Sequence, residues 1–243
     1  MDQVIYDSFI NVLEKELVPA LGCTEPIAVA YAAAKGREVL GAFPEKLTVT
    51  CSGNIIKNVM GVVVPATGGL SGIEAAALIG AVGGDPSKEL EVLASVTDED
   101  RAKVRELLAK DLCDVKISQS KARLHIIVEM YAGSQSSLVE IIHTHTGIVR
   151  IEKNGELLYS ESCYEDEDGG ADLDYSFLNM ENIYQFANEV KIQDVKAILD
   201  RQIEYNTRLA RAGLTDPYGA NVGKTLVEVY GRSFEVMAKA LPA

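Results

Sequence analysis

Hydrophobic residues change their spacing along this chain, and this change limits the choice of fold more than any other property. Near both ends, apolar residues recur every three or four positions, whereas from Cys113 to Tyr159 they alternate with polar residues. The first pattern predicts amphipathic helices and the second predicts half-buried strands. Because helical segments flank one block of strands, we expect an α+β fold, in which a helical body is interrupted by a small α/β unit with an antiparallel sheet.

The same spacing predicts the individual elements. Helices are expected at 4–18, 24–40, 71–82, 98–110, 176–190, 192–211 and 221–240. Strands are expected at 46–51, 113–118, 123–131, 137–145 and 148–159, the last folded into a hairpin at Asn154-Gly155. We therefore expect a helical body formed by residues 1–45 and 175–243, with an α/β unit at 46–160.

An acidic stretch separates these two predicted regions. Residues 161–174 contain seven Asp or Glu residues and no Lys or Arg, and Gly169-Gly170 lies within them. A run of like charges around two glycines is typical of a solvated linker. The alternative is a cation-binding loop, but the stretch lacks the alternating ligands and closing Glu of an EF-hand.

Composition excludes several classes of protein. The 243 residues include 23 basic and 36 acidic side chains, a formal net charge of −13, which disfavours nucleic acid and anionic membranes as partners. No apolar run reaches the roughly 18 residues that a membrane span needs. The first residues lack the basic and apolar segments of a secretory signal. We therefore expect a cytoplasmic protein that does not associate with membranes.

The four cysteines are too far apart for a small disulfide framework or a paired zinc motif. Cys51 and Cys113 are in phase with the apolar residues of their strands, which predicts that both pack in the core. Cys163 lies in the acidic stretch, where negative neighbours disfavour a further thiolate. This leaves Cys23 as the cysteine placed for chemistry.

Cys23 directly precedes a predicted helix, next to Thr24 and Glu25. The partial positive charge at a helix N-terminus favours a thiolate, whereas the neighbouring carboxylate raises the thiol pKa. The pair could share a proton, one group acting as base and the other stabilising charge. The alternative is a buried cysteine that packs in the turn, as most free cysteines do.

Two glycine-containing segments form a second candidate region. The first runs from Cys51 to Asn58 and the second from Val62 to Gly72, into a predicted helix. Small and hydroxyl residues before a helix can bind an anion through backbone N–H groups, and Lys57 adds a cation for a carboxylate. The alternative is a pair of ordinary turns.

Three of these segments, in this order, resemble the L-cysteine desulfidase family, which is related to the alpha chain of bacterial iron–sulfur L-serine dehydratases. They are Gly22-Cys23-Thr24-Glu25-Pro26, Ser52-Gly53-Asn54-x-x-Lys57-Asn58 and Val64-Pro65-Ala66-Thr67-Gly68-Gly69. The resemblance extends over essentially the whole chain. It implies amino-acid catabolism by a lyase that β-eliminates L-cysteine or L-serine to pyruvate, ammonia and sulfide or water, and it leaves the choice of substrate open.

The resemblance also implies site residues. Cys23 matches the cysteine expected near the substrate, as base or cluster contact, with Glu25 as its catalytic partner. Substrate-binding positions follow from the three matched segments: Thr24, Ser52, Asn54, Lys57, Asn58, Thr67, Gly68 and Gly69.

The family enzyme carries an oxygen-sensitive [4Fe–4S] cluster, whose cysteine ligands lie in a further C-terminal helical region. Since this chain stops at Ala243, we expect a truncated chain, a split gene or a degenerate relative. Such a chain alone would hold no cluster and be inactive. Its partners would be the missing region or a second chain, and a homo-oligomer is expected because the last helix offers an apolar stripe: Val222, Leu226, Val229, Tyr230, Phe234 and Met237.

Two alternatives remain open. One is a non-catalytic module that binds a small amino acid and has a regulatory role. The other concerns the histidines: if Tyr131 pairs with Ser137 in a hairpin, His125 lies opposite His143 and on one face with His145. Three imidazoles on one face could bind zinc or nickel, although unliganded histidines are common on polar sheet faces.

Overall fold

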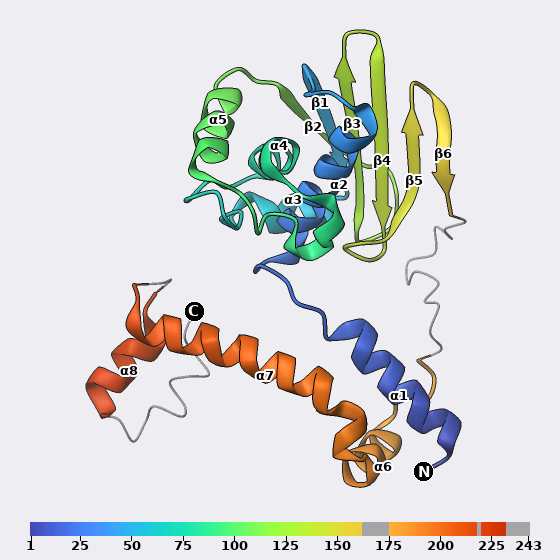
Figure 1. The fold of residues 1–243 in the computed structure, drawn as a ribbon, viewed down its shortest axis with the longest axis vertical. Helices are drawn as coiled ribbons and strands as arrows, with labels where there is room; N and C mark the ends of the chain where they lie inside the picture. Colours follow the sequence, from blue (N-terminus) through green and yellow to red (C-terminus); the bar gives the residue numbers. More distant parts are fainter. Residues whose placement is uncertain (162–174, 218–219, 232–243) are drawn as a thin grey trace. The chain divides into compact units, whose positions relative to one another are not determined.

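The computed structural model describes residues 1–161, 175–217 and 220–231 (Figure 1). The chain forms two compact units, one from Met1–Pro19 and Leu173–Ala243 and the other from Ala20–Asp172. The second unit contains the sheet, and the first contains only helices among its described residues. A helical unit built from both chain ends, with an α/β unit inserted, confirms the predicted α+β class.

The sheet has six strands in the order β2-β1-β3-β4-β5-β6. They are β1 (Lys46–Cys51), β2 (Cys113–Ile117), β3 (His125–Ala132), β4 (Gln135–Ile142), β5 (Ile148–Lys153) and β6 (Glu156–Ser160). Neighbouring strands are antiparallel except β1 and β2, which are parallel. The sheet is therefore mixed, where the sequence pattern predicted an antiparallel one, because the parallel β1–β2 pair is joined through helices rather than by a hairpin.

Helices cover one face of this sheet (Figure 1). They are α2 (Thr24–Leu40), α3 (Gly53–Met60), α4 (Ile73–Gly83), the 3₁₀ segment η1 (Pro86–Glu91) and α5 (Asp98–Leu108). Helix α2 packs against β3 and β4 and against α4. Residues 24–45, expected in the helical body, thus belong to the α/β unit, and the boundary lies at Pro19 rather than at residue 45.

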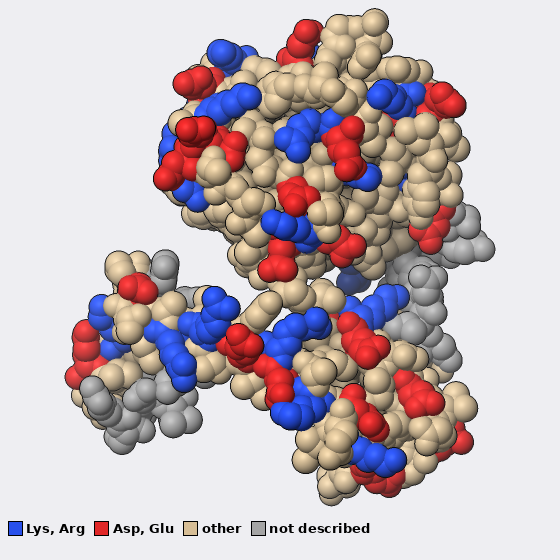
Figure 2. Space-filling model, in the orientation of Figure 1, with Lys and Arg blue, Asp and Glu red and all other residues tan. Residues whose placement is uncertain are grey.

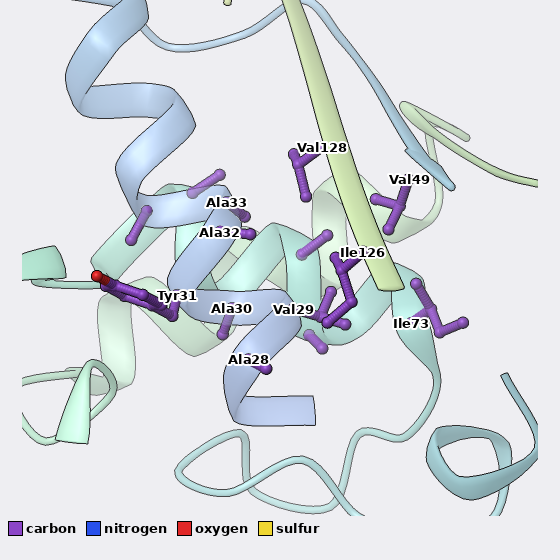
Figure 3. Packing of buried hydrophobic residues seen from close by; sticks show 14 of the residues in the cluster. Ala28, Val29, Ala30, Tyr31, Ala32, Ala33, Val49, Ile73, Ile126 and Val128 are labelled. Carbon is purple, nitrogen blue, oxygen red and sulfur yellow. The ribbon is translucent and has the colours of Figure 1, made fainter. Parts of the chain in front are cut away.

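Small residues allow α2 and α4 to approach closely. Five alanines of α2 are fully buried: Ala28, Ala30, Ala32, Ala33 and Ala34. Figure 3 shows the first four of them among their neighbours. A Cβ atom added at Gly80 of α4 would lie only 2.2 Å from the Ala30 carbonyl oxygen. The backbones therefore meet where a larger residue would clash, which places α2 inside the unit.

Period-two alternation explains the two faces of the sheet. Alternate residues of β1 and β3 point toward the helices and are 0% exposed: Leu47, Val49, Cys51, Ile126, Val128 and Met130. Their neighbours lie on the opposite, open face, which carries His125 and Ile127 of β3 and Glu140 of β4. The open face is where polar side chains of the sheet meet.

The helical unit contains α1 (Gln3–Glu16), α6 (Met180–Glu189), α7 (Ile192–Thr215) and α8 (Val222–Tyr230). Its core is aromatic: Phe9 stacks on Phe186 with ring centroids 4.5 Å apart and meets Phe177 edge-on at 4.9 Å. The Tyr6 hydroxyl donates to Asp194 over 2.7 Å and joins α1 to α7. Helices from the two ends of the chain thus share one small core.

Some expectations fall partly outside the described residues. Only Glu161 of the predicted linker 161–174 is described. Of the apolar stripe in the last helix, Val222, Val229 and Tyr230 are exposed and Leu226 is partly buried, whereas Phe234 and Met237 lie outside the described residues. Self-association through this stripe stays a prediction.

Charge is mixed on the face shown in Figure 2, where acidic and basic side chains of the described residues alternate over short distances. Among the described residues, no helix combines the length and hydropathy that crossing a membrane requires.

Candidate functional site

The N-terminus of α2 places three of the predicted site residues side by side. Cys23 occupies the N-cap position in an extended conformation (φ −61°, ψ 122°), and its side chain makes no N-cap hydrogen bond. Gly22 before it has φ +135°, and a Cβ there would lie 3.5 Å from Pro65. The turn therefore brings the second glycine-containing loop close to Cys23, as glycine allows.

A hydrogen-bonded cluster forms around the Glu25 carboxylate. The Cys23 thiol donates to Oε2 over 3.0 Å, and the Asn58 side-chain amide donates to Oε1 over 3.1 Å. Asn58 lies on α3, which the sequence pattern had indicated as a turn. Both carboxylate oxygens are held by predicted site residues from two separate helices, so the orientation of Glu25 is set by its neighbours.

The connection between β4 and β5 adds an imidazole. His145 Nε2 lies 3.0 Å from the Thr24 hydroxyl, and the ring is partly buried. Sequence reasoning considered His145 only as a metal ligand, because nothing in a single sequence indicates that residue 145 meets residue 24. We refer to Cys23, Thr24, Glu25, Asn58 and His145 as the thiol cluster.

The environment of the thiol cluster determines where its protons reside. Burial and the hydrogen bond to Glu25 raise the pKa of the Cys23 thiol. The hydrogen bond from Cys23 is the main cause that lowers the pKa of Glu25, with a further contribution from Asn58. Burial lowers the pKa of His145 against the opposing pull of Glu25. At neutral pH the cluster thus holds a thiol, a carboxylate and a neutral imidazole.

The other residues predicted on the first segment take different places. Ser52 is 4% exposed, accepts from the Ile55 N–H and donates to the Arg123 carbonyl over 2.7 Å, so its hydroxyl caps α3. Asn54 and Lys57 are exposed on α3, on the turn that precedes Asn58. Of this group, only Asn58 hydrogen-bonds to the thiol cluster among the described residues.

The second loop is closed by its own threonine. Thr67 is 0% exposed, donates to the Val64 carbonyl over 2.7 Å and accepts from the Leu70 N–H over 3.1 Å. Gly68 and Gly69 have φ of +69° and +102°, and a Cβ on Gly68 would lie 3.3 Å from the Arg105 guanidinium. The Thr67 hydroxyl is thus engaged within the loop, and Gly68 faces α5.

The described cysteines do not fit an iron–sulfur cluster. Such a cluster is held by several thiolates, but Cys51 and Cys113 are buried, and burial raises the pKa of each to about 12. Cys23 is the one partly exposed cysteine in the part of the chain that the structure describes. Within those residues, no group of three or more His, Cys, Asp and Glu side chains could hold a metal ion.

The hairpin register on which the three-histidine site depended is wrong by one residue. Tyr131 pairs with Ser136 rather than Ser137, which places Ile142, not His143, opposite His125. The two-residue turn Gly133-Ser134, with Gly133 at φ +55°, sets this register. The imidazoles of His125 and His145 accordingly have different partners, in Glu140 and Thr24.

Fold and thiol cluster together define an α+β protein with a half-buried thiol and carboxylate at a helix N-terminus. The chain is similar to UPF0597 proteins of Lachnoclostridium phytofermentans, Desulfitobacterium hafniense and Treponema denticola, with 54%, 45% and 41% identity over 239, 240 and 243 residues. These matches cover 98%, 98% and 99% of this chain and 57%, 55% and 56% of the relatives, so the chain spans a little more than half their length. No family model matches, and no solved structure does.

Proposed function

We propose that the thiol cluster performs the proton transfers of a lyase that β-eliminates a small amino acid, cysteine or serine, and that this chain forms part of the complete enzyme. The observation that carries the proposal is the Glu25 carboxylate, held at both oxygens by Cys23 and Asn58 beside a partly buried helix N-terminus. The resemblance of the Cys23, Asn58 and Thr67 segments to the L-cysteine desulfidase family supports the same reaction.

The helix supplies a place for the amino-acid substrate. Cys23 makes no N-cap hydrogen bond, Pro26 has no N–H, and the Glu25 N–H contacts the Cys23 sulfur and the Glu25 carboxylate, so the Thr24 N–H is the first-turn group that a substrate carboxylate would use. The neutral imidazole of His145, 3.0 Å from Thr24, supplies a second polar group on the same side of the helix.

The protonation states of Cys23 and Glu25 indicate which of the two acts as the base. Because the proton resides on sulfur, Glu25 is the group able to accept one, and we assign it as the base that removes the α-proton. The electron pair of that C–H bond forms the Cα–Cβ double bond, and the Cβ–S or Cβ–O bond breaks as sulfide or hydroxide leaves. The resulting 2-aminoacrylate tautomerises to an imine, which water hydrolyses to pyruvate and ammonia.

A [4Fe–4S] cluster, which the resemblance implies, would need ligands beyond the described residues, since those residues do not fit one. No step above is assigned to it. The proposal therefore concerns only what Cys23, Glu25 and their neighbours contribute to the complete protein.

The test is an anaerobic assay of pyruvate and sulfide from L-cysteine, and of pyruvate from L-serine, after reconstitution with iron and sulfide. We expect turnover from the complete protein and none from residues 1–243 alone. Cys23→Ala in the complete protein should reduce turnover by about tenfold, because it removes the hydrogen bond that orients the Glu25 base. Exposed Ser95 provides a matched control, as Ser95→Ala should leave turnover unchanged.

Two results would overturn the proposal. Undiminished turnover in Cys23→Ala would remove the thiol cluster from the reaction. Binding of L-cysteine to the reconstituted complete protein, measured by calorimetry, with no pyruvate formed would instead favour the non-catalytic amino-acid-binding module.

A further inference from the structure

The open face of the sheet contains a second polar cluster, separate from the thiol cluster. It lies beside a cavity of about 700 Å³, at the end of β2 and the start of β3. Ser118, Ser120, Lys121 and His125 line the polar side of the cavity, and Ile117 and Ile127 line the apolar side. The cavity is wide and open to solvent, so it can admit a small organic molecule without enclosing it.

Three side chains beside the cavity form a continuous chain of hydrogen bonds. Ser118 Oγ lies 2.6 Å from His125 Nδ1, and His125 Nε2 lies 2.8 Å from Glu140 Oε1. His125 is only 6% exposed, whereas Ser118 is partly exposed. The hydroxyl is thus the end of the chain that a ligand can reach.

The fold holds each member in place. Ser118 follows the last residue of β2, and its N–H donates to the Cys51 carbonyl over 2.8 Å. His125 begins β3, where its carbonyl accepts from the Ser52 N–H over 2.9 Å. Glu140 projects from β4 and lies 3.8 Å from an Arg150 nitrogen. The three residues come from three strands or strand ends, so a rigid sheet fixes their geometry.

The neighbours also determine the direction of the hydrogen bonds. Ser118 Oγ accepts from the Ser120 N–H over 3.1 Å, and with the ring proton on Nε2 toward Glu140, His125 Nδ1 is the acceptor for the Ser118 hydroxyl proton. The hydrogen bond from His125 is the largest cause that lowers the pKa of Glu140, and the Arg150 charge adds to it, so its carboxylate accepts the proton on Nε2. Hydroxyl, imidazole and carboxylate therefore follow in the order that activates a serine, with Nδ1 rather than Nε2 facing the hydroxyl.

We propose that Ser118 is a nucleophile activated by His125 and oriented through Glu140, and that the cavity accepts small esters or thioesters that carry a negative charge. The Lys121 ammonium at the cavity wall is the group that would attract that charge. This is an acyl-transfer site, independent of the lyase reaction proposed for the thiol cluster.

The chemistry balances with water as the only co-reactant. Ser118 Oγ forms a bond to the carbonyl carbon while its proton passes to His125 Nδ1. The carbonyl–oxygen or carbonyl–sulfur bond of the substrate then breaks, and the leaving alcohol or thiol takes that proton. Water, deprotonated by His125, attacks the acyl group in turn and releases a carboxylic acid and free Ser118. Glu140 positions the imidazole throughout and keeps its charge.

The alternative is that His125 is a buried histidine with satisfied hydrogen bonds and no reactivity. The activated serine and the unreactive histidine predict different rates for the reaction of Ser118 with an electrophile that mimics an acyl group. An unactivated serine does not react at a measurable rate with fluorophosphonates, whereas a serine beside a base forms an O–P bond and expels fluoride.

The experiment treats the whole chain with a small dialkyl fluorophosphonate and locates the adduct by peptide mass spectrometry. We expect one phosphoryl adduct per chain, at Ser118, and none after Ser118→Ala. Glu140→Gln should slow labelling by at least about tenfold, since the orienting carboxylate is lost. Ser95→Ala, at an exposed serine in the turn before α5, is the matched control and should label like the parent chain.

Mapping the adduct on the unsubstituted chain keeps the test independent of whether any variant folds. No adduct at Ser118, or labelling no faster than in the urea-unfolded chain, would overturn the proposal. Equal rates in the parent chain and in a Glu140→Gln variant with an unchanged circular dichroism spectrum would do the same. The result does not depend on the lyase proposal, because Cys23→Ala should label at the parental rate.

Discussion

The two polar clusters of the α/β unit pair a nucleophile with a carboxylate in opposite ways. Cys23 contacts Glu25 directly, with 3.0 Å between sulfur and oxygen. Between Ser118 and Glu140, by contrast, stands the imidazole of His125. Direct contact keeps the proton on the nucleophile, because a thiolate beside a carboxylate would place two negative charges together. An intervening imidazole accepts the proton instead. A carboxylate can therefore suppress or promote a nucleophile, depending on what lies between them.

The largest expected effect comes from neutralising the carboxylate of the thiol cluster. In the complete protein, Glu25→Gln keeps the size of the side chain but removes the base, so formation of pyruvate should fall by about 100-fold or more. Glu38→Gln is the control, since Glu38 is exposed near the other end of α2. An unchanged rate in Glu25→Gln would show that Glu25 is not the base.

Different elements hold the two clusters in place. Helix α2 carries the thiol cluster, whereas the sheet carries Ser118, His125 and Glu140. Gly80→Ala would force apart α2 and α4, because the new Cβ meets the Ala30 carbonyl at 2.2 Å. We expect a loss of about 1–3 kcal/mol in the free energy of unfolding, measured with urea.

Gly61→Ala is the matched control for this substitution, since a Cβ there has no neighbour within 4 Å. At urea concentrations where the Gly80→Ala variant is still folded, labelling of Ser118 should persist. Equal stability of the two variants would show that the helices separate at little cost.

A smaller effect tests directly whether contact with Glu25 suppresses the thiol. The hydrogen bond and charge of Glu25 raise the pKa of Cys23, so Glu25→Gln should lower it and increase the thiolate fraction at pH 8. Iodoacetamide alkylation of Cys23 should then become up to about tenfold faster, equivalent to one pKa unit.

The measurement follows alkylation against pH in a Cys163→Ser background, with the adduct located by mass spectrometry. Buried Cys51 and Cys113 serve as internal controls and should stay unmodified. A profile that does not move to lower pH in Glu25→Gln would show that burial alone, the largest cause, sets the pKa of Cys23.

The smallest effect is expected from Arg150, which lies 3.8 Å from Glu140 and also pairs with Glu152. Its side chain is 44% exposed, so water screens the interaction. Arg150→Gln should change fluorophosphonate labelling of Ser118 by less than about threefold. A larger change would make Arg150 part of the mechanism rather than a neighbour of it.

Local signals in the sequence were sufficient for several elements. The helix at 24–40 and the strand at 46–51 have the predicted bounds, because Pro26 fits the first turn and Gly41 ends the helix at φ +78°. Helix α3 was missed because Ser52-Gly53-Asn54 resembles a turn. Ser52 is in fact the N-cap, and the apolar residues Ile55 and Val59 are spaced as in a helix and buried.

The candidate sites were less accessible from sequence because their members meet only through the tertiary fold. Cys23 and Glu25 are neighbours in the chain and were predicted together. The contact of Asn58 with Glu25 depends on the packing of α3 beside α2, and that of His145 on the end of β4. The chain from Ser118 to Glu140 depends on a strand register that a one-residue error moves to the other face.

The burial of α2 has a consequence for motion within the α/β unit. Its residues 27–34 are enclosed between α4 and the sheet, so deuterium from solvent can reach their amides only when the unit opens as a whole. The exchange rate of these amides then measures global opening, while the connection between β4 and β5, which carries His145, can fluctuate separately. A ligand that orders only this connection would slow exchange around residues 143–147 but not at residues 27–34. Comparing the two exchange rates would therefore show where the ligand binds.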